Sequence, residues 1–418
     1  MPARKRLAAT GGSGPDTRLR LAAGIGVPCE GAPALKRYIR GTSAPTPDEP
    51  FYQTGIPLGG LGAGNFEWTY YGNFNHWQLN IGTNFRESLP ADQFSVFVQS
   101  PERKVAQVLY AGPGPYQWQW NYPVGAGTYY ALYPRAWAVY DLPDLPVELA
   151  VEAFSPIIAH NYKETSYPVA IFVWRAKNSG PTPVTLSLML TWANDFPGDV
   201  RRGHYNRLVE DPDAVAVVLD SADAQAEVRE MDGGEFCVAT SRTPGVTVSY
   251  LARWELQGDG SEVWADFADD GILSNRQDQR PGKVGAALAV RLDLAPGEQA
   301  EFPIVLAWDI PMFNFAEGSN LWFKYYTNYW GASADCSFDI AKEALRNYRA
   351  WEAAIEEWQR PIIEDPSRPD FYKCDLFNQL YRLGQGGTAW EAGGRFATIS
   401  CFDYLNYICY DVWYKASF

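Results

Sequence analysis

The stretch Val184-Thr-Leu-Ser-Leu-Met-Leu-Thr191 decides the fold class of this 418-residue chain. Its apolar residues recur with a period of two, which is typical of a strand with one buried and one exposed face. Similar short runs, rich in Val, Thr, Tyr and Trp, recur between turn residues from about Phe94 to Pro311. The clearest ones cover 94–99, 147–154, 169–177, 184–192, 214–219, 246–254, 286–294 and 302–308. So many strands with so few helical patterns predict a large antiparallel β-sandwich.

After residue 338 the apolar period lengthens to three or four residues, which predicts an amphipathic helix. We expect this helix to end at Pro361, with a linker over 362–369. A second helical pattern follows and stops at Gly384. The apolar stripes are Ile340, Ala344, Tyr348, Trp351, Ile355 and Trp358 in the first helix, and Cys374, Phe377, Leu380 and Tyr381 in the second.

These patterns predict four regions. Residues 1–45 are rich in Gly, Pro, Ala and Thr and are expected to form a flexible tail. The β-sandwich is assigned to 46–336, a linker helix to 337–366 and the start of an all-α domain to 367–418. About fifty residues are too few to close such a domain, so it is expected to be incomplete in this chain.

The composition narrows the classes of partner. A formal net charge of −14 argues against nucleic acid and against anionic membrane surfaces. No run of 18 apolar residues exists, so no transmembrane segment is predicted. Arg4-Lys5-Arg6 is not followed by the apolar stretch of a signal peptide. We therefore expect a cytoplasmic location, with peripheral membrane association left open.

Several familiar kinds of site do not fit the sequence. The six cysteines include no CxxC pair, and the three histidines are too far apart for HExxH, so neither a disulfide framework nor a zinc site is predicted. No cofactor is expected. Spacing alone does not exclude a Ser-His-Asp triad, but no GxSxG motif is present. The glycines from Gly55 to Gly64 match neither phosphate-binding pattern and are interpreted as points where strands approach closely.

The last stretch, 395–418, crowds aromatic residues around two carboxylates, Asp403 and Asp411. A sugar site needs such groups, because rings stack on the pyranose face while carboxylates bind hydroxyls and transfer protons. A core and turn rich in tyrosine is the commoner interpretation of the same pattern. In that interpretation Asp411 is a buried acid that caps a helix.

Long motifs in a consistent order point to a family. They are Gly55-Ile-Pro-Leu-Gly-Gly-Leu-Gly with Trp77-Gln-Leu-Asn, Phe154-Ser-Pro-Ile-Ile with His160-Asn-Tyr-Lys-Glu-Thr-Ser-Tyr-Pro-Val, and Phe377-Asn-Gln-Leu-Tyr with Gly386-Gly-Thr-Ala-Trp390. Over roughly 51–418 the chain resembles family-116 glycoside hydrolases, the non-lysosomal glucosylceramidase or bile-acid β-glucosidase family. The resemblance implies a β-sandwich followed by an (α/α)6 barrel, and retaining hydrolysis of a β-glucoside or glucosylceramide-like substrate.

The same resemblance locates the site residues. Arg395-Phe-Ala-Thr-Ile-Ser-Cys-Phe-Asp-Tyr matches the family's nucleophile segment and puts Ser400 in place of the catalytic glutamate. Asp411 matches an aspartate that binds glucose hydroxyls, and the family's acid/base aspartate falls beyond Phe418. Since a serine does not replace a carboxylate in forming a glycosyl intermediate, this chain is expected to be inactive alone.

Two alternatives stay open. The first is a non-catalytic homologue that binds sugar or serves assembly, with Ser400 as a natural loss or an engineered replacement. The second is one half of a two-chain enzyme, whose partner chain completes the barrel. A partial barrel would then expose an apolar face built from Phe377, Leu380, Tyr407 and Trp413. The sequence does not specify the aglycone or the oligomeric state.

Overall fold

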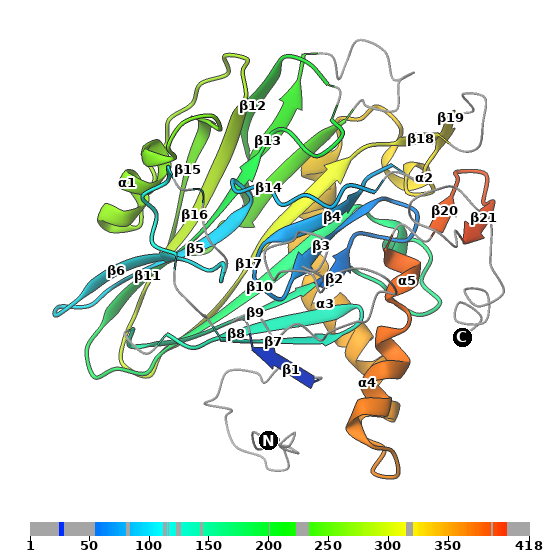
Figure 1. Cartoon of the computed structure of the whole chain (residues 1–418), viewed down its shortest axis with the longest axis horizontal. Helices are drawn as coiled ribbons and strands as arrows, with labels where there is room; N and C mark the ends of the chain where they lie inside the picture. Colours follow the sequence, from blue (N-terminus) through cyan, green and yellow to red (C-terminus); the bar gives the residue numbers. More distant parts are fainter. Residues whose placement is uncertain are drawn as a thin grey trace, which may run out of the picture.

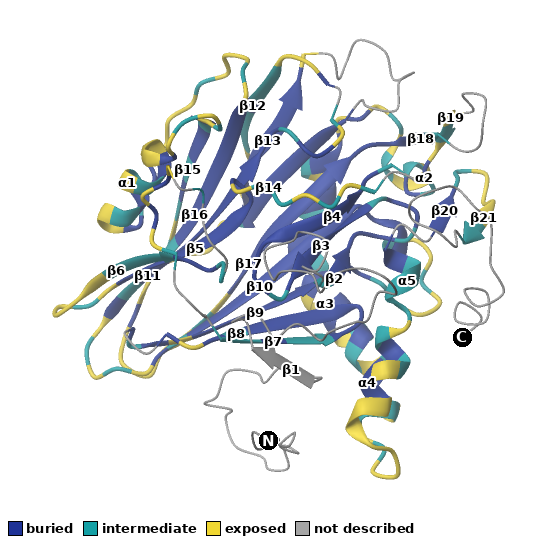
Figure 2. Cartoon of the chain, in the orientation of Figure 1, coloured by how far each residue is buried: buried dark blue, intermediate teal, exposed yellow. Residues whose placement is uncertain are grey.

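The computed structural model describes residues 25–28, 55–80, 84–111, 115, 117–122, 127–142, 145–199, 201–222, 234–314, 321–385 and 388–398. In this part of the chain two large antiparallel sheets pack face to face (Figure 1). The predicted β-sandwich is therefore confirmed. Figure 2 shows that the sheets are largely buried, while exposed residues gather in the loops and on α1 and α4.

The first sheet has nine strands in the order β1-β7-β8-β9-β10-β17-β14-β13-β12. All neighbours in it pair antiparallel. In that order the strands are Ile25–Pro28, Gly127–Leu132, Arg135–Tyr140, Val147–Phe154, Val169–Asn178, Gln299–Asp309, Glu235–Ser241, Ala214–Ser221 and His204–Glu210.

The second sheet has five strands in the order β15-β16-β11-β5-β6. They are Val246–Glu255, Val284–Leu294, Val184–Ala193, Gln93–Gln99 and Lys104–Val108. All eight strands predicted from the sequence are present, each with ends within three residues of the prediction.

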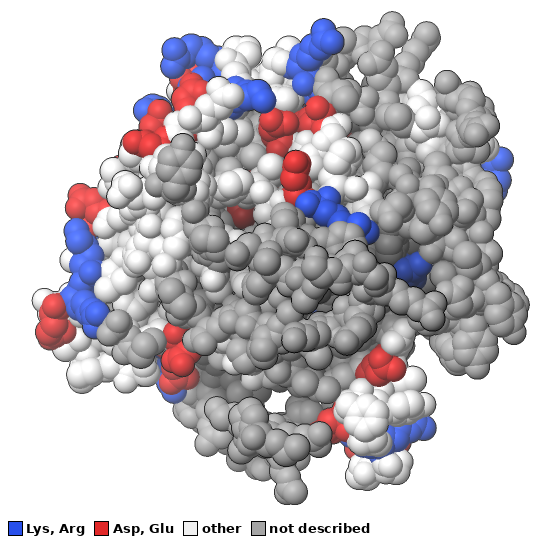
Figure 3. All heavy atoms as spheres, in the orientation of Figure 1, with Lys and Arg blue, Asp and Glu red and all other residues white. Residues whose placement is uncertain are grey.

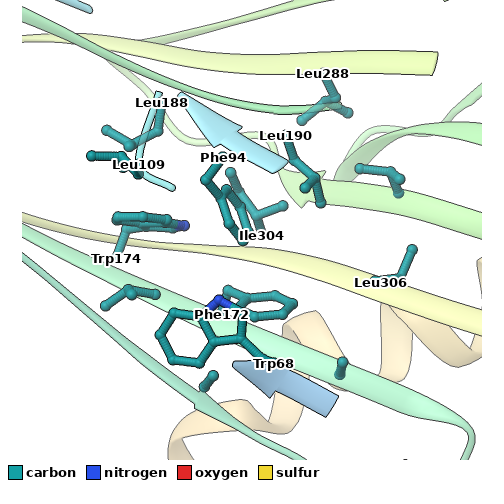
Figure 4. Close-up of a cluster of buried hydrophobic side chains, with 14 of the residues drawn as sticks. Trp68, Phe94, Leu109, Phe172, Trp174, Leu188, Leu190, Leu288, Ile304 and Leu306 are labelled. Atoms are coloured by element: carbon teal, nitrogen blue, oxygen red, sulfur yellow. The ribbon is translucent and has the colours of Figure 1, made fainter. Parts of the chain in front are cut away.

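The core between the sheets is dominated by aromatic rings (Figure 4). Phe94 of the five-stranded sheet meets Phe172 and Trp174 of β10 edge-to-face, with ring centroids 5.0 and 4.9 Å apart. Trp68 reaches Phe172 from below at 6.0 Å. Edge-to-face contacts add to the stabilisation from apolar burial, so these rings help to hold the two sheets together.

The outer face of β11 differs from expectation. The alternation in 184–191 predicts one exposed face, yet Ser187, Met189 and Thr191 are fully buried. A second apolar layer covers them, built from α1 (Ser261–Asp270) and a tryptophan cluster that includes Trp118 and Trp254. The sequence patterns do not predict α1, because Val263 and Phe267 are its only buried residues.

The helix predicted after residue 338 is α3 (Ser337–Ile363), which packs on the outer face of the nine-stranded sheet. The predicted stripe is confirmed from Ile340 to Ile355. The expected end at Pro361 is wrong, because the helix runs two residues further. Proline fixes φ at a helical value, but it removes one backbone hydrogen bond and its ring crowds the carbonyl four residues earlier, so the helix continues for only two residues beyond it.

A third, small sheet joins β2 (Gly55–Leu58), β3 (Asn65–Thr69) and β4 (Phe74–Gln78). The close-approach interpretation of its glycines is confirmed. A Cβ on Gly55 would lie 1.8 Å from the carbonyl oxygen of Trp68, and one on Gly60 would lie 2.5 Å from the backbone of Ser166. The latter residue belongs to a short 3-10 helix, Glu164–Ser166. Side chains larger than hydrogen would push these backbones apart.

Two expectations about the chain's ends need correction. Ile25–Pro28, inside the stretch assigned to a flexible tail, forms β1 and pairs with β7. A strand there satisfies backbone groups that an open sheet edge would leave unpaired. The second predicted helix is divided into α4 (Asp370–Asn378) and α5 (Tyr381–Gly384). Phe377 is buried against Leu132, Trp137 and Trp358 and is not part of an exposed apolar face.

Buried charges tie α3 to the sheet. Glu152 of β9 accepts hydrogen bonds from Arg135 at 3.2 Å and from Arg175 at 2.9 Å. The same arginines bond Glu356 and Glu352 of α3, at 2.9 and 2.8 Å. Burial works to raise the pKa of Glu152, but the two guanidinium groups hold it below its ordinary value.

None of the helices in the described residues is long and apolar enough to cross a membrane. On the described part of the face in Figure 3, acidic and basic side chains lie in small mixed groups.

We expect Phe172→Ala to lower the free energy of unfolding by about 3–5 kcal/mol, because it opens a cavity among packed rings. The matched control is Phe371→Ala on α4, whose side chain is 65% exposed, and its effect should stay within about 0.5 kcal/mol. Urea unfolding followed by tryptophan fluorescence measures both. Equal losses in the two variants would contradict this assignment of the core.

Glu152 should also govern acid stability. The pKa of Glu152 is lower in the folded chain than in the unfolded chain. The ionised carboxylate therefore stabilises the fold at pH values above the unfolded pKa, and this stabilisation is lost as the pH falls through the folded pKa. At neutral pH we expect the free energy of unfolding of Glu152→Gln to be about 3–5 kcal/mol lower than that of the parent. This difference should become small below pH 4. Unfolding free energies measured from pH 3 to 7 provide the test. A constant difference across that range would contradict it.

Candidate functional site

The sequence-predicted site residues Ser400, Asp403 and Asp411 lie outside the described residues. The structure does describe the hairpin that leads to them. Its strands are β20 (Thr388–Trp390) and β21 (Phe396–Thr398), and Thr398 is two residues before Ser400. The hairpin therefore contains the start, from Arg395, of the segment that the resemblance predicts to carry the nucleophile position.

The turn of the hairpin is closed by the carboxylate of Glu391. It accepts hydrogen bonds from the backbone N–H groups of Gly393 and Arg395, at 2.8 and 2.9 Å, and from the Arg395 guanidinium at 2.9 Å. These bonds, led by the guanidinium, lower the pKa of Glu391. Gly394 has a φ of +93°, which glycine adopts without strain. Glu391 is thus engaged in holding the turn.

Trp390 is the centre of an aromatic cluster. Its ring stacks on Tyr325, with centroids 4.0 Å apart and planes 7° from parallel. Tyr162 and Phe396 meet it edge-on at 6.0 and 5.6 Å. The Arg395 guanidinium lies 3.8 Å from the ring centroid of Trp322, a cation–π contact.

Four members of this region are exposed. We call them the aromatic surface: Tyr162, Phe323, Tyr329 and Phe396, between 40% and 63% exposed. Figure 1 shows the supporting elements together at one end of the molecule: α2 (Thr327–Trp330), β18 (Met312–Asn314), β19 (Leu321–Phe323) and the β20–β21 hairpin. Exposed rings of this kind stack on sugar rings or cover apolar groups.

Backbone hydrogen bonds attach the hairpin to the sandwich. The N–H of Tyr325 donates to the carbonyl of Trp390 at 2.9 Å, and that of Ala392 donates to Phe323 at 2.8 Å. The N–H of Gly62, in the glycine-rich loop, donates to the Thr388 hydroxyl at 2.9 Å. A Cβ on Gly62 would lie 2.6 Å from the Cβ of Trp390, so only glycine fits against the hairpin.

A second attachment uses the polar face of β3 and β4. The buried Glu67 carboxylate pairs with His76 Nδ1 at 3.0 Å and accepts a hydrogen bond from the Gln385 side chain, just after α5. Asn65 donates to the carbonyl of Gly384. Asn65 and Glu67 thus connect the end of α5 to β3, across 319 and 318 positions of sequence.

Lys324 is buried beneath this junction. Its ammonium donates to the carbonyls of Ala63 and Leu79, at 3.1 and 2.9 Å, and so joins the loop before β3 to the end of β4. Burial lowers the pKa of Lys324 to about 7, although the carboxylate of Asp309 acts in the opposite direction. Near neutral pH the folded protein therefore holds this amine partly uncharged.

The sequence-based argument missed the aromatic residues that gather around the hairpin. Trp322, Tyr325 and Tyr329 lie in the run Trp-Phe-Lys-Tyr-Tyr-Thr-Asn-Tyr-Trp at 322–330, whose aromatic density was the available signal. Among the described residues, no group of three or more His, Cys, Asp or Glu side chains could hold a metal ion. What this region offers chemically is an aromatic surface and a rigid attachment for the segment that follows.

Comparison with known protein families gives a match that covers most of the sandwich. The model described as "beta-glucosidase 2, glycosyl-hydrolase family 116 N-term" matches residues 55–351. This is well over half of the chain, and the chain belongs to glycosyl hydrolase family 116 through its N-terminal region.

Two matches to solved structures have low sequence identity and low TM-scores. A protein described as a kojibiose phosphorylase from the human microbiome matches 81% of this chain and 40% of its own, with 8% identity and a TM-score of 0.37. A family GH92 α-mannosidase from Bacteroides thetaiotaomicron matches 86% of this chain and 43% of its own, with 11% identity and a TM-score of 0.34. The chain thus spans about two fifths of the length of these structures.

Lys324 should make the free energy of unfolding depend on pH. Between about pH 7 and its unfolded pKa near 10.5, the unfolded chain binds a proton that the folded chain does not, so stability should rise with pH. We expect a slope of about 1 kcal/mol per pH unit between pH 7.5 and 9. Lys324→Met should flatten this slope, whereas Lys104→Met, at an exposed site, should leave it unchanged. Guanidinium unfolding at several pH values measures it, and a slope that persists in Lys324→Met would refute the assignment.

Proposed function

We propose that this chain is the N-terminal portion of a β-glucosidase- or glucosylceramidase-like protein, in which the sandwich supports the segment holding the nucleophile position. The observation that carries the proposal is the attachment of the β20–β21 hairpin to the family domain. The nucleophile motif starts at Arg395, inside this hairpin, and continues directly to Ser400. Residues from 367 onward would then begin an (α/α)6 barrel, as the family resemblance implies.

The chemistry of the family is a double displacement. One carboxylate attacks the anomeric carbon while another protonates the leaving oxygen, and water then hydrolyses the glycosyl intermediate. In this chain Ser400 would occupy the place of the attacking carboxylate. Its neutral hydroxyl forms no such intermediate without a base to activate it, so we propose that the chain does not hydrolyse β-glucosides by this route.

Asp411 and the aromatic surface would supply substrate binding. A carboxylate accepts hydrogen bonds from two neighbouring sugar hydroxyls, which is the role proposed for Asp411. Tyr162 and Phe396 flank Trp390 with exposed rings, and Phe396 itself belongs to the segment that leads to Ser400. Rings in this position suit the face of a glucose unit or an apolar aglycone such as that of a glycolipid.

A cytoplasmic location is part of the proposal. Cys237, Cys336 and Cys374 are buried free thiols, as is usual in a reducing compartment.

Sugar binding without hydrolysis is the second candidate, and Ser400 is the observation that favours it. A site that keeps Asp411 and the rings but lacks the nucleophile would retain affinity for glucose while losing turnover.

The test is release of 4-nitrophenol from 4-nitrophenyl β-glucoside. We expect no turnover by the natural chain above the buffer rate. Ser400→Glu restores only the nucleophile, so we expect it to release at most about one equivalent of 4-nitrophenol per chain, while the matched Ser400→Ala variant releases none, because no residue here matches the acid/base aspartate that the resemblance implies for the second step.

Clear turnover by the natural chain that Asp411→Ala abolishes would overturn the proposed inactivity. If Ser400→Glu stays at the level of Ser400→Ala, the nucleophile assignment fails. Calorimetric titration with glucose then tests the binding candidate.

A further inference from the structure

A row of polar side chains crosses the end of the nine-stranded sheet, far in sequence from the nucleophile segment. The strand register pairs Tyr205 with Asp220 and Glu235 with Asp309, on β12, β13, β14 and β17. Asp220 and Glu235 are 5% and 1% exposed. Three carboxylates so deeply buried at one sheet end need partners that offset their desolvation.

Part of the row is explained by α3. Glu235 Oε1 accepts hydrogen bonds from the N–H and hydroxyl of Ser337, at 3.0 and 2.5 Å, and Asp309 Oδ2 accepts from the N–H of Cys336 at 3.1 Å. Negative charge at a helix N-terminus is stabilising, and these bonds fix the start of α3. Glu235 Oε2 and both oxygens of Asp220 take no part in these bonds, and Asp220 Oδ1 accepts instead from the N–H of Ser221 at 2.7 Å.

Beside these groups is a cleft of about 340 Å³. It is lined by Tyr205, Arg207, Asp220, Glu235, Ser333, Ala334 and Asp335. Its volume lies in the range of small-molecule sites, and its lining comes from two separate parts of the fold, the β12–β14 edge and the loop before α3.

Arg207 organises the cleft. Its Nη2 donates to Glu235 Oε2 at 2.8 Å and its Nε to Asp220 Oδ2 at 3.4 Å. The Tyr205 hydroxyl also donates to Asp220 Oδ2, at 2.8 Å. The guanidinium carries five N–H donors, and these two bonds engage only two of them. Donors and acceptors therefore alternate along the wall of the cleft.

The opposite wall is the loop before α3. Ala334 is buried there with a φ of +63°, a left-handed conformation that is unfavourable for alanine. Its neighbours Ser333 and Asp335 are exposed and line the cleft, with the serine hydroxyl bonded to the aspartate. This wall adds one hydroxyl and one carboxylate to the set.

The chemistry of the lining selects a class of ligand. Three carboxyl groups disfavour an anion, and Arg207 between two of them disfavours a cation. A metal ion is also disfavoured, since the described residues contain no suitable group of ligands. Each hydroxyl of a sugar both donates and accepts, so it satisfies carboxylates, guanidinium and tyrosine together. Burial raises the pKa of Glu235 to about 7, which lowers the charge of the cleft near neutral pH.

We propose that this cleft is a binding site for a neutral polyhydroxylated ligand, namely one monosaccharide unit. Arg207 and Asp220 hold its hydroxyls, and the ring of Tyr205 borders the cleft beside them. The site goes beyond the function proposed above, because it requires neither Ser400 nor Asp411.

The experiment is a titration of the full chain with glucose, followed by saturation-transfer NMR. Glucose is expected to bind with a millimolar dissociation constant that Asp411→Ala leaves measurable. Arg207→Met should weaken this remaining binding at least tenfold. Arg242→Met is the matched control, since Arg242 pairs with Glu210 at the exposed far end of the same strands, and its binding should equal that of the parent.

Arg207 partners buried carboxylates, so Arg207→Met could unfold the sheet edge. Tyr205→Phe and Ser333→Trp provide second variants, the first by removing one hydroxyl and the second by filling the mouth of the cleft. Both should weaken glucose binding severalfold while the circular dichroism spectrum and melting temperature stay near those of the parent.

Three results would overturn the proposal. One is the absence of saturable glucose binding in the Asp411→Ala chain. Another is unchanged binding in folded Tyr205→Phe and Ser333→Trp. The third is tighter binding of putrescine or sulfate than of glucose with the same dependence on Arg207, which would define a site for ions. None of these results depends on β-glucosidase activity.

Discussion

Both faces of the nine-stranded sheet are apolar, and the rest of the molecule is arranged to cover them. On β10, Ala170, Phe172 and Trp174 face the second sheet, while Val169, Ile171 and Val173 face α3. A strand buried on both sides reads as a continuous apolar run, as 169–174 does. The need to exclude water from the outer face brings α3 against the sheet, and the direction of α3 determines where the chain after Ile363 begins.

Covering an apolar sheet with a helix does not by itself set the position of that helix along the strands. Charged pairs supply this specificity here. Glu152, Arg135 and Arg175 face α3 from the sheet, and Glu235 and Asp309 bind its N-terminus. Such buried polar groups add little net stability but penalise any shifted packing, because a shift would leave charges unpaired.

The β20–β21 hairpin is held against the sandwich by contacts from several segments of the chain. The N–H of Gly62 donates to Thr388 of the hairpin, and Trp390 stacks on Tyr325. The ammonium of Lys324 donates to the carbonyl of Ala63 in the glycine-rich loop. The contacts of Gly62 and Lys324 join residues 326 and 261 positions apart in the sequence, so the position of the hairpin depends on the sandwich.

The sequence alone determined the period of the strands, the stripe of α3 and the role of the glycines, since these follow from local sterics and from which face of an element is apolar. It also indicated the family, which the match over residues 55–351 shows. Only the tertiary structure decided that β11 is covered on both faces, that Pro361 lies inside α3 and that Phe377 is buried. It alone brought Trp322 and Tyr325 to the hairpin, and Arg207 to Asp220 and Glu235. Contacts of this kind join residues without any regular spacing, so no local pattern records them, and only packing and desolvation select them.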